Sequence, residues 1–271
     1  MSINRRQFLR RAGVVTALGL GGSFAFTGLR GTVAEAASDA GYKTSDKSLT
    51  AKHWAMVVDM SKFKSEDDIK RVTESCVNIH NIPDFGNPKD EIMWIWQDDY
   101  EHTFSGGDNE YLTESFKELP FMVLCNHCEN PPCVKACPTG ATFKRPDGIV
   151  EMDYHRCIGC RFCMGACPFG ARSFNYRDPR PFIKKTNPNF PTRTPGVVEK
   201  CTFCVERLAK GEIPACVEAS KGGLIFGDLD DPNSEVRKIV STKFTIRRKT
   251  DLGTQPSVYY LIDRVGGGEH A

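Results

Sequence analysis

Cysteine spacing is the feature that most constrains how this chain can fold. The clearest run consists of four cysteines and a proline: Cys157, Cys160, Cys163, Cys167 and Pro168. This C-x2-C-x2-C-x3-C-P spacing is typical of bacterial ferredoxins, in which three thiolates hold one [4Fe–4S] cluster and the fourth ligates another. The run therefore predicts a loop that wraps one cluster and lends its last cysteine to a second.

A second run precedes the first and has one extra residue in its second gap. Its members are Cys125, Cys128, Cys133 and Cys137. Two such runs in series predict crossed ligation. The ligands predicted for the first cluster are Cys125, Cys128, Cys133 and Cys167. The ligands predicted for the second cluster are Cys157, Cys160, Cys163 and Cys137.

A third run has a long second gap and lacks its last cysteine. Cys201, Cys204 and Cys216 are followed by Ser220 where a fourth cysteine is expected. A weak internal repeat locates the partner run at 63–76. In it the stretch MVVDMSKF (56–63) matches VEMDYHRC (150–157), so that Asp59 corresponds to Asp153.

The partner run has lost its first three cysteine positions and kept one cysteine. Those positions fall on Phe63, Glu66 and Ile69, and Cys76 remains. Together with Ser220, these three positions make up the four ligands of one site, and none of the four is a cysteine. The predicted ligands of its twin, the third cluster, are all present: Cys76, Cys201, Cys204 and Cys216. Three clusters of four ligands account for all 12 cysteines of the chain.

Three other interpretations of this sequence are open. An exported, cysteine-rich chain can be a disulfide framework, and zinc sites also use C-x2-C pairs. The third close cysteine and the trailing Cys-Pro argue against both readings. A labile fourth cluster held by Ser220 with Asp67 or Asp68 is a further alternative, although hard oxygen ligands suit iron–sulfur cores poorly. His127 and His155 adjoin ligand positions and could tune a potential through hydrogen bonds.

The N-terminus predicts an export signal over residues 1–36. Arg5-Arg6 precedes an apolar, glycine-rich stretch that ends before the A-x-A sequence Ala34-Glu35-Ala36. Paired arginines are typical of the twin-arginine signal, whose pathway carries folded proteins. Residues 12–29 could instead remain as a membrane anchor, although 18 residues barely span a bilayer. The formal net charge is +2 for the chain and −2 for residues 37–271, which indicates no nucleic-acid partner.

The remaining sequence predicts an α+β fold with two ferredoxin-like units related by a pseudo-two-fold axis, within one domain over 37–271. The core unit covers 119–178, and the flanking unit combines 53–83 with 197–230. Strands are expected in 53–60, 91–99 and 119–125, and a hairpin in 141–153 with Pro146-Asp147-Gly148 as its turn. The proline-rich segment 179–196 and the insertion 84–118 are candidate docking loops.

The motifs CNHCENPPCVKACPTGATFKRPDGIV, DYHRCIGCRFCMGACPFGARSFNYRDPRPF and RRKTDLGTQPSVYYL carry a family resemblance. The chain resembles the four-cluster electron-transfer subunits of dimethyl sulfoxide, polysulfide and nitrite reductases. Within them it is similar to the exported DsrO subunits of the Dsr transmembrane complex, called heterodisulfide-reductase-like menaquinol oxidoreductase in archaea. The resemblance implies an NrfD-type membrane partner that handles quinone and an exported multihaem cytochrome c. It departs from the wider family at Phe63 and Ser220, where one cluster has vanished.

The predicted function is therefore a non-catalytic one-electron relay through three [4Fe–4S] clusters, in dissimilatory sulfur metabolism and peripheral to the extracytoplasmic face of the membrane. The alternatives are a subunit of a molybdopterin-type reductase, a small enzyme that reduces a sulfur compound at an exposed cluster, and a disulfide-stapled binding protein.

Overall fold

The computed structural model describes residues 45–261 except 64, 105–110, 114–116 and 118. The predicted export signal and the C-terminal tail lie outside the described residues. In chain order the described elements are β1 (Trp54–Asp59), η1 (Met60–Lys62), α3 (Glu66–His80), β2 (Ile95–Asp98), α4 (Tyr100–Thr103), β3 (Phe121–Leu124), α6 (Pro132–Lys135), β4 (Thr142–Lys144), β5 (Val150–Met152), α7 (Phe162–Ala166), β6 (Ser173–Phe174), η2 (Arg180–Phe182), β7 (Val198–Glu199), α8 (Val205–Leu208), α9 (Ala215–Ala219), β8 (Leu224–Asp228), α10 (Glu235–Thr242), β9 (Thr245–Ile246), η3 (Thr250–Leu252) and β10 (Val258–Leu261). Among these residues, no helix has the length and apolar character that a bilayer crossing requires.

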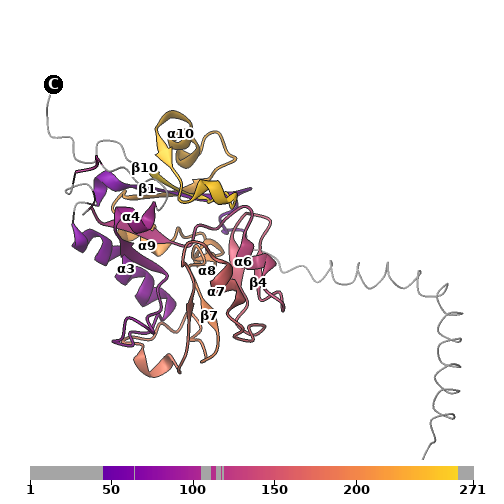
Figure 1. The fold of residues 1–271 in the computed structure, drawn as a ribbon. Coiled ribbons are helices and arrows are strands. Elements are labelled where there is room, and N and C mark those ends of the chain that lie inside the picture. The colour runs from indigo at the N-terminus through magenta and orange to yellow at the C-terminus, as the bar shows by residue number, and fades with distance from the viewer. Residues whose placement is uncertain (1–44, 64, 105–110, 114–116, 118, 262–271) are drawn as a thin grey trace, which may run out of the picture. The chain divides into compact units, whose positions relative to one another are not determined.

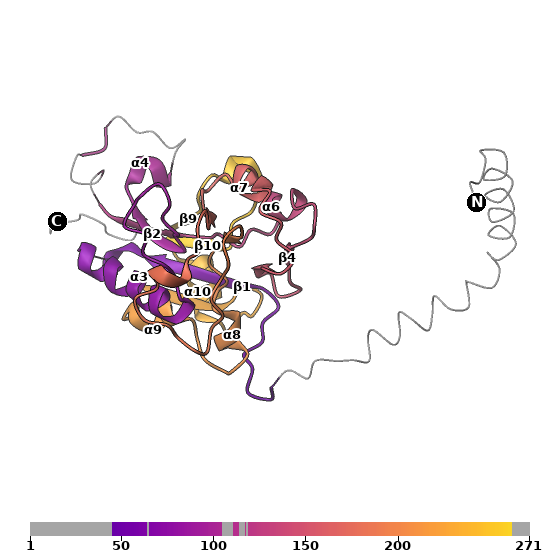
Figure 2. The ribbon, with the colours of Figure 1, turned by 90° about the horizontal axis from the view of Figure 1, so that it is seen from below.

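The largest sheet joins segments that lie far apart in the chain. Its strand order is β8-β1-β10-β9, with β1 antiparallel to β8 and parallel to β10. Side chains alternate across β1 as the two-residue period of a strand requires. Ala55 and Val57 pack toward α10, whereas Met56 and Val58 belong to the main core that also contains cysteines. Figures 1 and 2 show α10 on one side of this sheet and α3 and α9 on the other.

Three two-stranded sheets hold the cysteine loops. They pair β2 with β3, β4 with β5 and β6 with β7, all antiparallel. Strand β3 ends at Leu124, directly before the first cysteine loop, and β7 ends two residues before Cys201. The β4–β5 pair is the predicted hairpin, and Gly148 in its turn has a φ of +87°. Two of these short ladders therefore fix where the cysteine runs that begin at Cys125 and Cys201 start.

The predicted strand regions and the mixed helix and strand content agree with an α+β fold. β1, β2 and β3 lie within the three ranges expected to contain strands. The predicted loop 179–196 contains the short helix η2 and is otherwise irregular.

A buried ion pair ties that proline-rich loop to the core. Arg193 and Glu199 are fully enclosed, with 1% and 0% of their side chains exposed, and their Nη2 and Oε2 atoms lie 2.7 Å apart. Arg193 also donates to the carbonyl oxygens of His80 and Asn81. Glu199 accepts from the indole N–H of Trp94 at 3.1 Å. Each charge is thus paired and hydrogen-bonded, as burial of an ion demands.

Candidate iron–sulfur centres

The first set of thiols combines both ferredoxin-type runs around one cavity. Four cysteines line this cavity: Cys125, Cys128, Cys133 and Cys167. Pro132 opens α6, which directs Cys133 inward, and the turn after Cys167 brings backbone N–H groups of Phe169 and Ala171 onto its sulfur. These are the four residues predicted for the first cluster, and they include the cysteine that crosses over from the other run.

The second set lines a separate cavity nearer the surface. Its cysteines are Cys137, Cys157, Cys160 and Cys163. Here Cys137 is the crossing member. Burial alone raises the pKa of the Cys137 thiol, but N–H groups of Thr142, Thr139 and Ala141 and the Thr139 hydroxyl outweigh burial and lower this pKa. Such donors hold a thiolate in place and tune the potential of a bound cluster.

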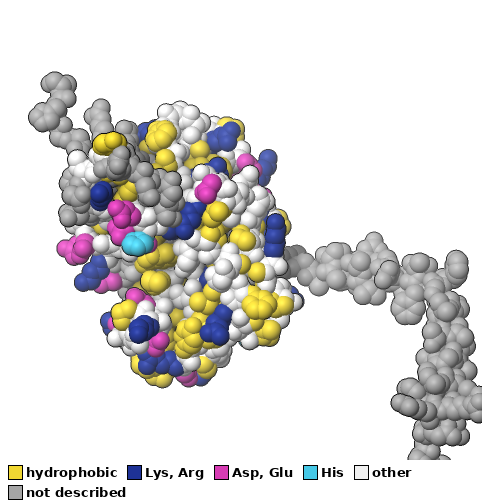
Figure 3. Space-filling view, viewed as in Figure 1, with side chains coloured by type: hydrophobic (Ala, Val, Ile, Leu, Met, Phe, Trp, Pro, Cys, Tyr) yellow, Lys and Arg dark blue, Asp and Glu magenta, His cyan; other side chains and the backbone are white. Residues whose placement is uncertain are grey.

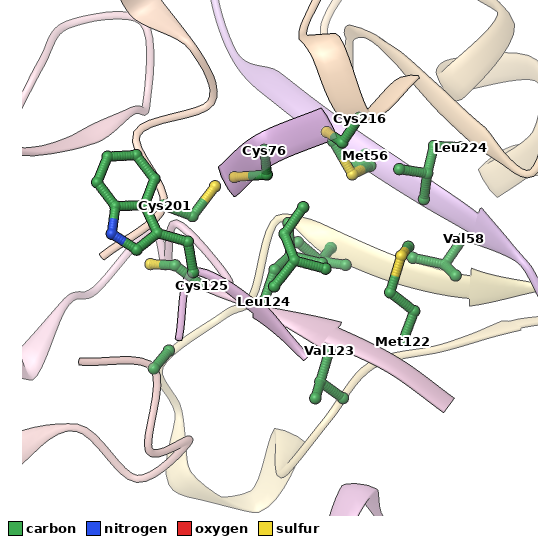
Figure 4. Packing of buried hydrophobic residues seen from close by; sticks show 14 of the residues in the cluster. Met56, Val58, Cys76, Met122, Val123, Leu124, Cys125, Cys201, Cys216 and Leu224 are labelled. Carbon is green, nitrogen blue, oxygen red and sulfur yellow. The ribbon is translucent and has the colours of Figure 1, made fainter. Parts of the chain in front are cut away.

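The third set gathers the remaining cysteines at the end of α3. Burial, and then the charges of Cys204, Cys201 and Cys216, raise the pKa of the Cys76 thiol well above its ordinary value. All four residues are buried. Figure 4 shows Cys76, Cys125 and Cys201 in one region of the core, with Cys216 beyond Cys76. This set contains the residues predicted for the third cluster.

The first set adjoins both of the others. The charge of Cys125 raises the pKa of Cys201, after the larger effect of burial. On the other side, the charge of Cys133 acts on Cys163, again after burial and beside Arg172. The three sets therefore form a row, with the first set in the middle.

The same backbone conformation recurs in the first C-x2-C pair of each of the three runs at 125–137, 157–167 and 201–216. The residue before the second cysteine has a positive φ in each: +40° at His127, +71° at Gly159 and +53° at Phe203. Glycine is required at 159, because a Cβ atom there would come within 2.5 Å of the Gly196 carbonyl oxygen. His127 and Phe203 adopt the conformation at a cost, and their rings stack on each other with centroids 3.7 Å apart. This stack joins the loops of the first and third sets.

The donor sets fit iron–sulfur clusters. None of the 12 cysteines, all within the described part of the chain, forms a disulfide. Burial and neighbouring thiols raise the pKa of Cys128 to about 12, and burial raises that of Cys216 to about 12. Thiols with so high a pKa ionise only beside a compensating positive charge, which the iron of a cluster would supply. Four converging thiols are also the ordinary ligand set of a [4Fe–4S] cluster.

The side chains at the positions predicted to have lost their cysteines are packed inside the protein. Phe63 is 3% exposed, and its ring lies so close to Gly223 that a Cβ there would meet Phe63 Cζ at 2.7 Å. Ser220 is also buried, and its hydroxyl donates to the Val217 carbonyl at 2.7 Å and accepts from the Leu224 N–H at 2.9 Å. Ile69 belongs to the same core cluster as Phe63. A buried phenyl ring and a hydroxyl with two hydrogen bonds thus occupy positions that would hold cysteines in an intact run.

The acids proposed as alternative ligands have other surroundings in the structure. Asp68 pairs with Arg71 at 3.1 Å, and Arg71 in turn donates to the Ala219 carbonyl at 3.0 Å. Asp67 lines a groove of about 750 Å³ between α3 and β2, which also reaches Cys76.

Several charged residues around the thiols carry no signal in the sequence. Arg172 lines the cavity of the first set and is 5% exposed. Lys200 is fully buried, and its ammonium group donates to the carbonyl oxygens of Val150 and Cys201. His80 has its Nδ1 3.4 Å from the Cys76 sulfur and its Nε2 2.9 Å from Glu206 Oε1. A basic residue next to a cysteine motif is too common to be singled out by spacing.

The two histidines singled out from the sequence differ in the structure. His127 is buried, and its Nδ1 accepts from the Val150 N–H at 3.1 Å. Burial and the charges of Lys200 and Arg172 lower the pKa of His127 well below its ordinary value. His155 is exposed.

Comparison with known proteins agrees with this chemistry. Residues 118–180 match the model of the 4Fe-4S dicluster domain, which covers the first two thiol sets. The chain is 44% identical over 237 residues to the Hdr-like menaquinol oxidoreductase iron-sulfur subunit 1 of Archaeoglobus fulgidus, covering 80% of this chain and 85% of that protein. It is 34% identical over 236 residues to the menaquinone reductase iron-sulfur cluster-binding subunit of Nitratidesulfovibrio vulgaris, covering 78% of this chain and 89% of that protein.

A third relative has a shorter match. The B subunit of polysulfide reductase from Wolinella succinogenes is 42% identical over 147 residues, which cover 54% of this chain and 68% of that protein. The family match spans the residues from which the first two thiol sets are built. The chain therefore belongs to the family of iron–sulfur electron-transfer subunits of oxidoreductase complexes that carry a 4Fe-4S dicluster domain.

Proposed function

We propose that this chain relays single electrons through three [4Fe–4S] clusters, each held by one of the thiol sets. The observation that carries the proposal is the grouping of 12 cysteines from four separate runs into three sets of four. The dicluster match accounts for two of these sets. The third set is supported by its burial and by the mutual interaction of its thiols.

Two ferredoxin-like units are part of the same proposal. Asp59 and Asp153, the residues that correspond in the internal repeat, make the same local turn. Asp59 accepts from the Ser61 N–H at 3.0 Å, and Asp153 accepts from the His155 N–H at 2.9 Å. The flanking segments also meet through the β1–β8 ladder. These equivalences support a pseudo-two-fold relation between a unit at 119–178 and a unit built from 53–83 and 197–230.

When bound, the clusters would supply one-electron carriers in a row. The protein's part is to space them, to exclude water and to set their potentials. Apolar core side chains such as Met56, Met122 and Leu124 pack beside the third set (Figure 4). The row gives the relay two ends, one at the surface cavity of the second set and one at the third set.

The complex we propose contains a membrane partner that handles quinone. Relatives named as menaquinol oxidoreductase, menaquinone reductase and polysulfide reductase subunits support this partner. An NrfD-type membrane subunit, a multihaem cytochrome c and a role as a DsrO subunit in sulfur metabolism follow from the same resemblance. The predicted twin-arginine signal would place the chain on the extracytoplasmic side. Relatives named as dimethyl sulfoxide and tetrathionate reductase subunits favour a molybdopterin-type reductase as the second candidate.

Iron and acid-labile sulfide analysis of the anaerobically purified chain tests the cofactor content. Three clusters predict about twelve irons and about twelve sulfides per chain, since each cube holds four of each. About sixteen irons would restore a fourth site at Ser220, and about eight would remove the third set from the relay. Metal-free protein with disulfides would contradict the proposal altogether.

The exposed end of the second set is the surface where we place docking of the membrane partner. Ile158 and Phe162 flank its cysteines and are 67% and 65% exposed. Figure 3 shows hydrophobic side chains gathered over the side where α6, α7 and β4 lie. Exposed apolar side chains of this kind mark interaction sites.

Phe162→Glu is expected to abolish co-purification with the membrane partner while all clusters remain, because a charge would be buried in the interface. The matched control is Phe244→Glu, at a phenylalanine that is 80% exposed and follows α10. The control should leave the complex intact. Equal yields of complex from both variants would place docking elsewhere.

A further inference from the structure

Arg172 is a buried cation in the wall between two of the thiol sets. It follows the Cys167-Pro168 turn and directly precedes β6. Its side chain lines the cavity of the first set, and the guanidinium interacts with Cys133 of that set. It also interacts with Cys163, which belongs to the second set.

The guanidinium is anchored from the side of the second cavity. Its Nη1 donates to the Thr142 hydroxyl at 3.0 Å and approaches the Met152 sulfur at 3.9 Å. Met152 itself lines the second cavity. Strands β4 and β5, which carry these two anchors, pair with each other and so hold the group in one position.

The other terminal nitrogen, Nη2, makes no hydrogen bond to an oxygen or nitrogen atom of the described residues, and the remaining interactions of the guanidinium are with cysteine thiols. This nitrogen is buried. A buried N–H group that lacks an acceptor is costly. The sulfur atoms of a cluster in the first cavity are acceptors that such a donor would meet.

The positive charge of Arg172 also favours an interaction with the clusters. An arginine remains protonated in proteins, so its positive charge here is permanent. The four thiolates of each set give every cluster a net negative charge, and reduction adds one more. Net charge and hydrogen bonds to the sulfurs set cluster potentials. A fixed cation between two clusters favours the reduced form of both.

We propose that Arg172 is a residue that raises the potentials of the first and second clusters together. The inference rests on the ligand sets proposed above. In this proposal the positive charge of Arg172 lies close to the first and second clusters, and the third cluster lies outside its close surroundings. Arg172 is thus a tuning residue for electron transfer and takes no part in holding iron.

The test is an EPR-monitored redox titration of the purified holoprotein carrying Arg172→Met. We expect the equilibrium constant for one-electron reduction to fall at least tenfold, about 59 mV, for two clusters and to stay unchanged for the third. Arg172→Lys keeps the charge and loses the planar fork, so its shift should be smaller. Arg237→Met removes the same charge from an exposed position of α10 and should shift no potential.

Iron analysis of each variant separates this inference from the ligation scheme. Full iron content with unshifted potentials in Arg172→Met would overturn the role of Arg172 and leave the three clusters standing. Equal shifts in the Met and Lys variants would show that charge is not the cause. Loss of iron from Arg172→Lys would show a structural role in place of tuning.

Discussion

Cys76→Ala should remove one cluster and leave two. Iron per chain should fall from about twelve to about eight, because each cluster contains four irons. Cys76 is 4% exposed near the end of α3, and alanine is the best helix former, so the helix should persist. The first and second sets share no ligand with Cys76 and should keep their clusters. The measurements are iron and sulfide content and EPR spectra of the reduced protein.

Ser220→Ala is the matched control for that variant. It changes a buried residue of the same flanking unit, at the position where the fourth cysteine of the third run is missing. The Ser220 hydroxyl already forms hydrogen bonds with Val217 and Leu224. Iron content should not change. A Cys76→Ala protein that still holds about twelve irons would refute the assignment of Cys76 to the third set, and loss of iron from Ser220→Ala would revive a fourth site.

Arg193→Met is expected to lower the free energy of unfolding by about 3–5 kcal/mol, because it leaves Glu199 buried without its partner. The apparent midpoint temperature of the holoprotein should fall by roughly 6–20 °C at a fixed scan rate. The loop 179–196 should also become accessible to proteases, since Arg193 ties it to the carbonyl groups of His80 and Asn81. Circular dichroism and limited proteolysis measure the two effects.

Two comparisons isolate the buried charge as the cause. Arg180→Met breaks the exposed pair with Asp178, whose atoms lie 2.6 Å apart, and should leave the midpoint temperature unchanged. The double variant Arg193→Met with Glu199→Gln removes both charges and should be more stable than Arg193→Met alone. If Arg193→Met unfolds at the same midpoint temperature as the unmodified protein, the ion pair does not contribute to stability.

Local features of this fold could be predicted from the sequence. The cysteines of a cluster-binding loop lie within a few residues of one another, so the spacing in the runs at 125–137 and 157–167 is enough to predict the loop geometry. The hairpin at 141–153 was equally local, because Pro146-Asp147-Gly148 supplies the turn. The matching turns at Asp59 and Asp153 also follow from residues only two positions apart.

Long-range features could not be predicted in the same way. In the β8-β1-β10-β9 sheet Met56 pairs with Val258, 202 residues later in the chain, and no feature of the short strand β10 indicates that β1 is its partner. Arg172, Lys200 and the Arg193–Glu199 pair sit among many basic and acidic residues, and only burial distinguishes them. The absence of a cysteine at Phe63 was visible in the sequence. The packing of Phe63 against Gly223 required the folded chain.

Iron-edge anomalous diffraction from anaerobically grown crystals of the holoprotein tests crossed ligation most directly. The account predicts three iron sites, one bounded by Cys125, Cys128, Cys133 and Cys167, one by Cys137, Cys157, Cys160 and Cys163, and one by Cys76, Cys201, Cys204 and Cys216. A fourth iron site beside Phe63 and Ser220, or Cys133 and Cys137 bound to the same cluster, would contradict it.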